Sequence, residues 1–459
     1  MRRATKPSDD ARSHNEKKLL TAVALSAILA PLNSTMIAVA LPGIVDDFNA
    51  SIASATWLVT AYLVVMASVQ PLAGKIGDSM GRRKLILASL TLFLAVSIGA
   101  AFAPNIWVAL AFRVGQALSI SIVLSNSYAI LRQTIPASRR GRTFGMVEAA
   151  TGLSAASGPL IGGLLITIFD WRAIFYMNVP VVIIAIMLAW QTLPHDSKSG
   201  AWKGFDYKGA LLLPATLVAV AVFFLMISRG AEPTTFVPVG IAVLVLATLL
   251  LKLELAHPSP VFQPRFYKNR GFAAPSISVG TSNLAMYSLL LVIPLLLTSR
   301  GGYTELEIGL ILTSLSIGMA LLTPIGGRLA DKYGRRMPVV LGLAITVSGT
   351  LIPAFSGSGI DILPLIVGLG LVGIGISGPG GRTSAVESVP LKDAGAGSGT
   401  YSTSRYLGSI IGSAILAGLI GIDRSNTEGI DTVFLIVTAA AIVAVISATF
   451  MKPRPSTDD

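Results

Sequence analysis

Three charged residues interrupt long apolar segments of this sequence and point to chemistry there. Arg113 and Arg405 each lie within an apolar run, where a charge costs roughly 2.5 to 3.5 kcal/mol if the run spans a membrane. Glu148, in "FGMVEAATG", is the clearest acid in such a run, and a buried carboxyl of this kind can carry a proton. An alternative role for Glu148 is an ion pair with nearby basic residues: Arg82, Arg139 or Arg140.

Arg113 needs a polar partner. Asn33, in "LNSTMIAVALP", lies late in the first apolar run, and at 1.5 Å per residue both side chains come within about 10 Å of the same end of their helices. The sequence therefore predicts a polar pair of Arg113 with Asn33. The structural alternative is a guanidinium that bonds only backbone carbonyls, and it applies also to Arg405, which lies nearer the middle of its run beside Tyr401 and Tyr406.

Further polar and aromatic side chains in the apolar runs suit a cavity for an amphipathic organic molecule. For each tyrosine, packing in the core is the alternative. The cavity candidates are Asn33, Tyr62, Arg113, Gln116, Asn126, Asn283, Tyr287, Tyr401 and Arg405.

The elements that position these residues are membrane helices. Of the 459 residues, 53% are hydrophobic and 13% charged, with a mean hydropathy of +0.73, which is unlike a soluble domain. Fourteen runs can cross about 30 Å of hydrocarbon; they begin near Leu19, Ser54, Leu85, Ile106, Thr143, Ile174, Gly209, Phe236, Phe272, Leu306, Pro338, Ile362, Ala396 and Thr432.

Charge assigns the sides of the membrane. If successive loops alternate, 29 of the 35 Lys and Arg residues fall on the side of the N-terminus. This bias places both termini in the cytoplasm and explains the net charge of +12 without a nucleic-acid partner. The absence of cysteine excludes disulfides and thiolate sites. We find no P-loop, nucleophile elbow or metal-ligand spacing, so we expect no enzyme, no metal and no cofactor.

An internal repeat divides the chain. "GKIGDSMGRRK" from Gly74 and "GRLADKYGRRM" from Gly327 match at Gly, Asp, Gly, Arg and Arg, 253 residues apart. That spacing predicts two parallel six-helix halves with two extra helices between them. The predicted units are a disordered basic N-terminus (1–18), a first bundle (19–195), a two-helix insert with its loops (196–268), a second bundle (269–451) and a tail (452–459).

With these motifs, the chain resembles the major facilitator superfamily, and within it the fourteen-span drug:proton antiporter branch. The resemblance covers nearly the whole chain and also includes "RVGQA", "GLSAASGPLIGGLL", "WRAIFYMNVP" and "STSRYLGSIIG". It implies an all-α membrane protein that rocks two bundles around a central site. It further implies an inner gate at Gly74, Asp78, Gly81, Arg82 and Arg83, with its repeat at Gly327, Asp331, Gly334, Arg335 and Arg336.

The fifth run carries the motif of the antiporters: Gly152, Gly158, Pro159, Gly162 and Gly163. Packing of small residues is its plainer explanation. The resemblance implies export of amphipathic or hydrophobic drugs, antibiotics included, in exchange for protons. We expect a monomer in the bilayer of the cell's inner membrane, a small-molecule substrate, and the proton gradient as energy source.

Asn33 departs from this pattern, because relatives of the branch commonly have Asp at that position. An amide can hydrogen-bond Arg113 but does not take up a proton at physiological pH. The departure weakens the inference of antiport and leaves Glu148 as the proton candidate. The alternative function is a facilitator or importer of a small nutrient such as a vitamin, with weak or no proton coupling.

Overall fold

The chain folds into a bundle of long helices. The computed structural model describes residues 9–194, 196, 206–376, 380–390, 393–420 and 427–452, with some side chains in 9–17, 137–149 and 320–331 outside that description. All regular elements of the described part are helical. The predicted all-α class is thereby confirmed.

The first half precedes the insert and comprises α1 (Asp9–Asp47), α2 (Ile52–Met80), α3 (Arg82–Ala101), α4 (Ile106–Thr134), α5 (Ala137–Ile168), α6 (Ala173–Tyr176) and α7 (Asn178–Thr192). The last predicted span of this half is thus broken at Met177, between the short α6 and α7. The second half comprises α10 (Arg270–Arg300), α11 (Glu305–Tyr333), α12 (Arg336–Ser356), η2 (Gly357–Gly359), α13 (Ile362–Ile376), α14 (Gly380–Glu387), α15 (Ala394–Ile420) and α16 (Thr427–Thr449).

The helix boundaries follow the repeat. Helix α2 runs from Ile52 to Met80 and α11 from Glu305 to Tyr333, so both ends are 253 residues apart. Each of these helices ends at a glycine with positive φ, Gly81 at 93° and Gly334 at 79°, a conformation that favours glycine. The two charged loops at these glycines lie on what we call the inner face, after the side expected from the charge distribution.

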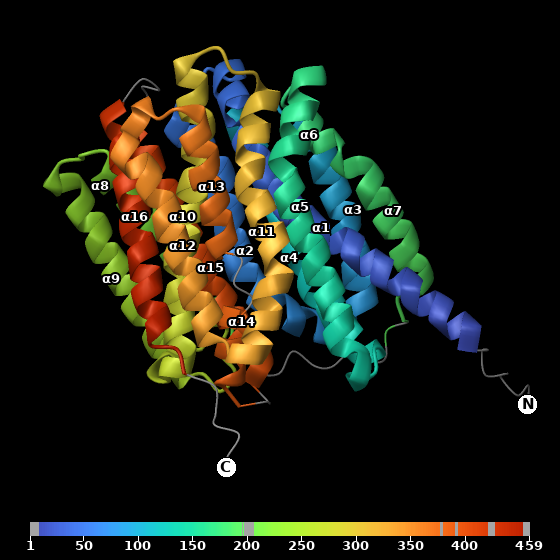
Figure 1. Ribbon diagram of the computed structural model, residues 1–459. Coiled ribbons are helices and arrows are strands. Elements are labelled where there is room, and N and C mark those ends of the chain that lie inside the picture. The colour runs from blue at the N-terminus through green and yellow to red at the C-terminus, as the bar shows by residue number, and fades with distance from the viewer. Residues whose placement is uncertain are drawn as a thin grey trace, which may run out of the picture.

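The insert consists of α8 (Tyr207–Ser228), α9 (Pro233–Ala256) and the short η1 (Pro264–Lys268). Helix α8 packs against α9, α2 and α15, and therefore touches both halves. Figure 1 shows α8 and α9 at one edge of the molecule, beyond the second half.

Three helix starts on the outer face, those of α2, α4 and α11, are capped by polar side chains. Asn105 accepts hydrogen bonds from the amides of Trp107 at 3.1 Å and Val108 at 3.0 Å at the start of α4. Thr304 and Glu307 form a reciprocal capping box at the start of α11. These caps supply acceptors for amide groups that a helix start leaves without partners.

The halves meet mainly through three helix pairs, α1 with α10, α2 with α15, and α5 with α11. Glycines allow the closest approach in the last pair. A Cβ atom on Gly309 of α11 would lie 2.4 Å from the carbonyl oxygen of Pro159, and one on Gly163 would lie 2.5 Å from that of Glu305. Backbone contacts of this kind are typical of small residues in membrane helix pairs.

Thirteen helical spans of the described part are long and apolar enough to cross a membrane. Helix α11, which covers the remaining predicted span, has 29 residues. One predicted boundary is wrong: α1 begins at Asp9, so residues 9–18 are helical and not disordered. The stretch "DDARSHNEKK" contains neither Pro nor Gly, and its two leading acids suit a helix N-terminus.

Candidate functional site

A layer of polar side chains lies where the two halves meet. Ser34 of α1 and Tyr287 of α10 share a hydrogen bond of 2.7 Å between their hydroxyl groups. Thr60 of α2 and Ser413 of α15 do the same at 2.8 Å. We call these four residues, together with Tyr62, Arg113, Arg405 and Tyr406, the central polar layer.

Tyr406 extends this layer between α2 and α15. Its hydroxyl accepts a hydrogen bond from Gln70 at 3.3 Å and one from the guanidinium of Arg405 at 3.0 Å. The same guanidinium lies 4.7 Å from the centre of the Tyr406 ring, a cation–π contact. Arg405 is exposed, although it lies well inside the 27-residue α15 and its neighbour Tyr406 is buried. Because a guanidinium facing lipid at this depth is costly, the exposed face of Arg405 indicates a polar opening.

Arg113 is the most deeply buried charge of the layer, with 1% of its surface exposed. It donates to Gln116 at 3.0 Å and to the carbonyl of Leu58 at 3.3 Å, and it lies 4.3 Å from the centre of the Tyr62 ring. Gln116 in turn donates to Ser97 at 2.8 Å. Nη2 of Arg113 is buried and has no acceptor in the described part of the chain.

The predicted pair of Arg113 with Asn33 is wrong. Asn33 instead forms a reciprocal amide pair with Asn178 at the start of α7: Asn33 Nδ2 donates at 2.7 Å and Asn178 Nδ2 donates back at 2.9 Å. Two amides satisfy each other in this way because each has a donor and an acceptor, whereas a guanidinium only donates. Both residues are buried, and the pair fastens α7 to α1.

The motif "WRAIFYMNVP" makes a second contact with α1 at the outer face. Arg172 forms an ion pair of 2.9 Å with Asp47, and the indole of Trp171 donates to the same carboxylate at 3.3 Å. Its role in the structure is therefore to attach α6 and α7 to α1. The motif itself was visible in the sequence, but its partners were not.

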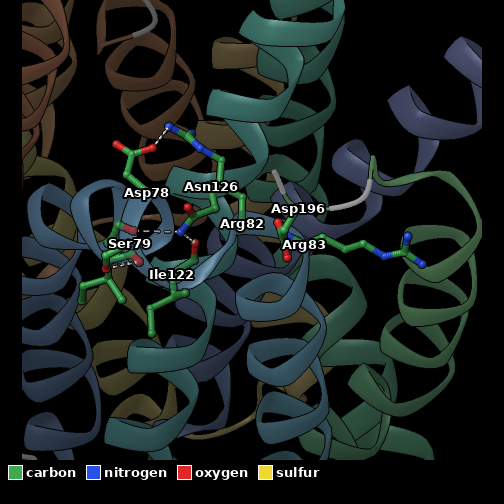
Figure 2. Close-up of polar contacts among 9 residues, drawn as sticks. Asp78, Ser79, Arg82, Arg83, Ile122, Asn126 and Asp196 are labelled. Carbon is green, nitrogen blue, oxygen red and sulfur yellow. Dashed lines mark hydrogen bonds and ion pairs between the residues drawn. The ribbon is translucent and has the colours of Figure 1, made fainter. Parts of the chain in front are cut away.

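Two predicted cavity residues bond mainly to backbone. Asn126 is fully buried and donates to the carbonyls of Ala73 and Ile122, both at 2.9 Å (Figure 2). It lies near the inner end of α2, where a Cβ on Gly77 would collide with it, so it belongs to the packing of α4 on α2. Asn283 donates to the carbonyl of Val279 in its own helix at 3.0 Å.

The first inner loop contains an ion pair and a helix cap. Asp78 pairs with Arg82, four residues later. Asp196, which follows α7, accepts hydrogen bonds from the amides of Arg83 at 2.8 Å and Lys84 at 3.0 Å at the start of α3. Figure 2 shows Asp78 joined to Arg82 and Asp196 beside Arg83. The sequence did not single out Asp196, since nothing local links it to a helix start 113 residues earlier.

The second inner loop has a different ion pair. Arg335 pairs with Glu387 at the end of α14. The surroundings of Gly327 and the side chain of Asp331 lie outside the described residues, so the predicted counterpart of Asp78 is placed only as part of α11. Arg336 lines a separate cavity of about 320 Å³ with Gly334, Tyr333, Met337, Val340, Leu341 and Thr449.

Of the four motif glycines of the fifth helix, three serve close approach. A Cβ atom would lie 1.8 Å from the Thr35 hydroxyl at Gly158 and 3.3 Å from the Met36 backbone at Gly162, and Gly163 contacts α11 as described. Gly152 has open space around it. Glu148, the proton candidate, is placed as part of α5, and its side chain lies outside the described residues.

Comparisons with known proteins agree with this architecture. Residues 23–259 and 276–459 match the family described as Major Facilitator Superfamily. The transporter YvkA of Bacillus subtilis (strain 168), described as an uncharacterized MFS-type transporter, is 35% identical over 443 residues, 96% of this chain and 97% of the relative. The multidrug resistance protein Stp of Mycobacterium tuberculosis is 30% identical over 424 residues, 90% of this chain and 78% of the relative.

A riboflavin transporter, RibZ of Clostridioides difficile, is 26% identical over 402 residues, 87% of either chain. Among solved structures, a mutant of the nucleoside transporter NupG superimposes with a TM-score of 0.64 at 12% identity, covering 95% of this chain and 100% of that one. At that identity the likeness shows the fold alone.

Proposed function

The chain belongs to the Major Facilitator Superfamily, and from that premise we propose that it is a secondary transporter that exports amphipathic or hydrophobic small molecules in exchange for protons. As a superfamily member it is a multi-pass membrane protein. The proposal further places it in the cell's inner membrane as a monomer, with both termini in the cytoplasm and the proton gradient in place of a cofactor.

The observation that carries the proposal is the uncompensated Arg113 in the central polar layer. A guanidinium that is 1% exposed, with Nη2 lacking an acceptor, is costly to bury and favours a bound partner with an electronegative atom. The ring of Tyr62 beside it offers a flat apolar surface. These features suit an aromatic or amphipathic substrate that is neutral or anionic, held by apolar contact and a few hydrogen bonds.

The contacts between the halves suit alternating access. Ser34 with Tyr287 and Thr60 with Ser413 are neutral hydrogen bonds, each with a net worth of about 1 kcal/mol. Neutral bonds of this size separate without leaving a buried charge behind, so the two bundles can rock apart at low cost. The inner ion pairs, Asp78 with Arg82 and Arg335 with Glu387, each stay within one half.

A second function, a nutrient facilitator without proton coupling, is favoured by the Asn33–Asn178 pair. Both members of that pair are neutral and satisfied, so the position at which the branch commonly has an acid takes no part in proton transfer. The riboflavin transporter among the relatives is of this substrate class. If export is instead coupled to protons, that coupling depends on Glu148 and not on position 33.

Purified protein in liposomes that contain a pH-sensitive dye tests the proposal. A proton gradient is imposed, amphipathic cations, neutral drugs, anionic aromatics and vitamins are added in turn, and wild type is compared with Glu148→Gln. The matched control is Glu232→Gln in the exposed loop between α8 and α9. Export is supported if a drug-like substrate releases protons through wild type and the control but not through Glu148→Gln. Vitamin flux that ignores the gradient supports the facilitator instead.

A further inference from the structure

Two carboxyl groups are buried against each other at the inner end of the insert. Asp206 caps the start of α8 and is 3% exposed, and Glu254 lies in the last turn of α9 and is 1% exposed. Of the 24 residues of α9, only Leu250 and Glu254 are buried. An otherwise apolar helix therefore packs inward through an acid, which is unexpected unless the acid has a specific partner.

One oxygen of each carboxyl group has a donor and the other has none. Asp206 Oδ1 accepts from the amide of Gly209 at 2.8 Å, and Glu254 Oε2 accepts from the amide of Phe262 at 3.2 Å. Asp206 Oδ2 and Glu254 Oε1 are buried without a donor in the described part of the chain. Both oxygens face the same small space, since each would lie 2.4 Å from a Cβ atom on Gly209. Because both oxygens lie 2.4 Å from this one position, the two carboxyl groups are close neighbours and interact electrostatically.

The charges around the pair do not neutralise it through a salt bridge. Lys75 of α2 interacts electrostatically with both acids, but its ammonium group donates to the carbonyl of Ser259 at 2.6 Å. The remaining charged or titratable groups nearby are engaged or exposed: Arg265 donates to the carbonyl of Leu255 at 2.5 Å, His257 accepts from the amide of Ser259, and Lys208, Lys252 and Tyr207 are exposed.

Two ionised carboxylates in such contact repel strongly, and a hydrogen bond between carboxyl groups requires a proton on one of them. A Cβ atom on Gly209 would collide with both oxygens, so no further side chain fits between the two carboxyl groups at this point. A proton is therefore the ligand that this geometry fits.

We propose that Asp206 and Glu254 share one bound proton and form a proton-binding site at the inner end of the two-helix insert. The site is separate from the central polar layer. It lies beside Lys75 in the first inner loop motif, where the insert contacts the first half. While the proton is bound, Lys75 bonds Ser259; once it leaves, the doubly charged pair attracts the Lys75 ammonium. The proton thus selects between two contacts of the insert with α2.

Infrared spectroscopy of the purified protein tests this proposal without any transport measurement, so the proposed function can fail while the proton site stands, and the reverse. Wild type at neutral pH should show the absorption of a protonated carboxyl group that disappears on titration to alkaline pH. Asp206→Asn and Glu254→Gln, which are close in shape to the native residues, should each lose that absorption at neutral pH, because the new amide donates to the remaining carboxylate. Glu232→Gln should retain it.

Lys75→Gln gives a graded second test. Removal of the nearby cation should move the disappearance of the absorption to higher pH, whereas Lys208→Gln, on the exposed face of α8, should leave it in place. The proposal is overturned if the absorption is absent from wild type at neutral pH, or equal in wild type and both pair variants. It is also overturned if the absorption appears only after sodium and potassium ions are removed, since a metal cation then occupies the pair.

Discussion

The hydroxyl groups of Ser34 and Tyr287 lie 2.7 Å apart, and the two residues are separated by 253 positions. That separation equals the distance between the two copies of the charged loop, so Ser34 and Tyr287 occupy equivalent positions of the two halves. The repeat therefore places a hydrogen bond between corresponding helices at the junction, where the halves must part during transport.

Loss of this bond should weaken the junction by about 1 kcal/mol. Ser34→Ala and Tyr287→Phe, measured singly and together by chemical unfolding in detergent, should show a coupling energy of about that size in a double-mutant cycle. Tyr176→Phe, at the exposed end of α6, is the matched control and should be neutral. A coupling energy near zero would mean that the two hydroxyl groups act independently.

Arg113→Met should leave the fold intact or more stable, because it removes a buried charge that has no acid partner in the described part of the chain. Transport of neutral and anionic substrates should fall at least tenfold, since the substrate loses the guanidinium beside Tyr62. Arg113→Lys should also be impaired, because an ammonium group lacks the planar fork of donors. The measurements are the unfolding temperature and the initial rate in liposomes. Arg229→Met, in an exposed outer loop, is the control, and equal rates in all variants contradict the prediction.

Asn33→Asp should make stability depend on pH. An ionised carboxylate at this position no longer donates to Asn178, and two acceptors then face each other, which costs about 1 to 3 kcal/mol. A protonated carboxyl group restores the donor. The unfolding temperature of Asn33→Asp should therefore approach that of wild type at low pH and fall below it as the pH rises, while Asn33→Ser shows no such trend. A constant difference across the pH range would contradict this reasoning.

Gly309→Ala should open the outer contact between α5 and α11, because its Cβ atom would lie 2.4 Å from the carbonyl oxygen of Pro159. Overpacking of this kind costs roughly 1 to 3 kcal/mol, and about 1.4 kcal/mol corresponds to a tenfold change in population. The chain has no cysteine, so a single Thr313→Cys, one turn further along α11, reports opening through its rate of thiol labelling from the outside. That rate should rise roughly tenfold.

Gly152→Ala is the control for this experiment, because in the described part of the chain no atom beyond the surrounding helix backbone lies within 4 Å of the Cβ position there. It should leave the labelling of Thr313→Cys unchanged and stabilise α5 slightly, since Ala favours helix over Gly. Faster labelling in both glycine variants would indicate a general loosening of the fold and not the specific collision with Pro159.

The sequence by itself determined the helices, the two halves and the insert. Each depends on a local property of the sequence. The length of an apolar run must match the thickness of the bilayer, and a repeated Gly, Asp and Arg pattern can be recognised without the rest of the chain. The buried charge of Arg113 could be predicted for the same reason, because an arginine in an apolar run is visible in the sequence alone.

Only the tertiary structure decided which polar groups meet. Asn33 pairs with Asn178, 145 residues away, and not with Arg113 at a similar depth. Glu254 is buried although it lies near the end of a helix with exposed apolar residues on most sides. The rotation of each helix about its axis selects these partners, and helices that are apolar nearly all round carry too weak a periodic pattern to reveal that rotation from sequence.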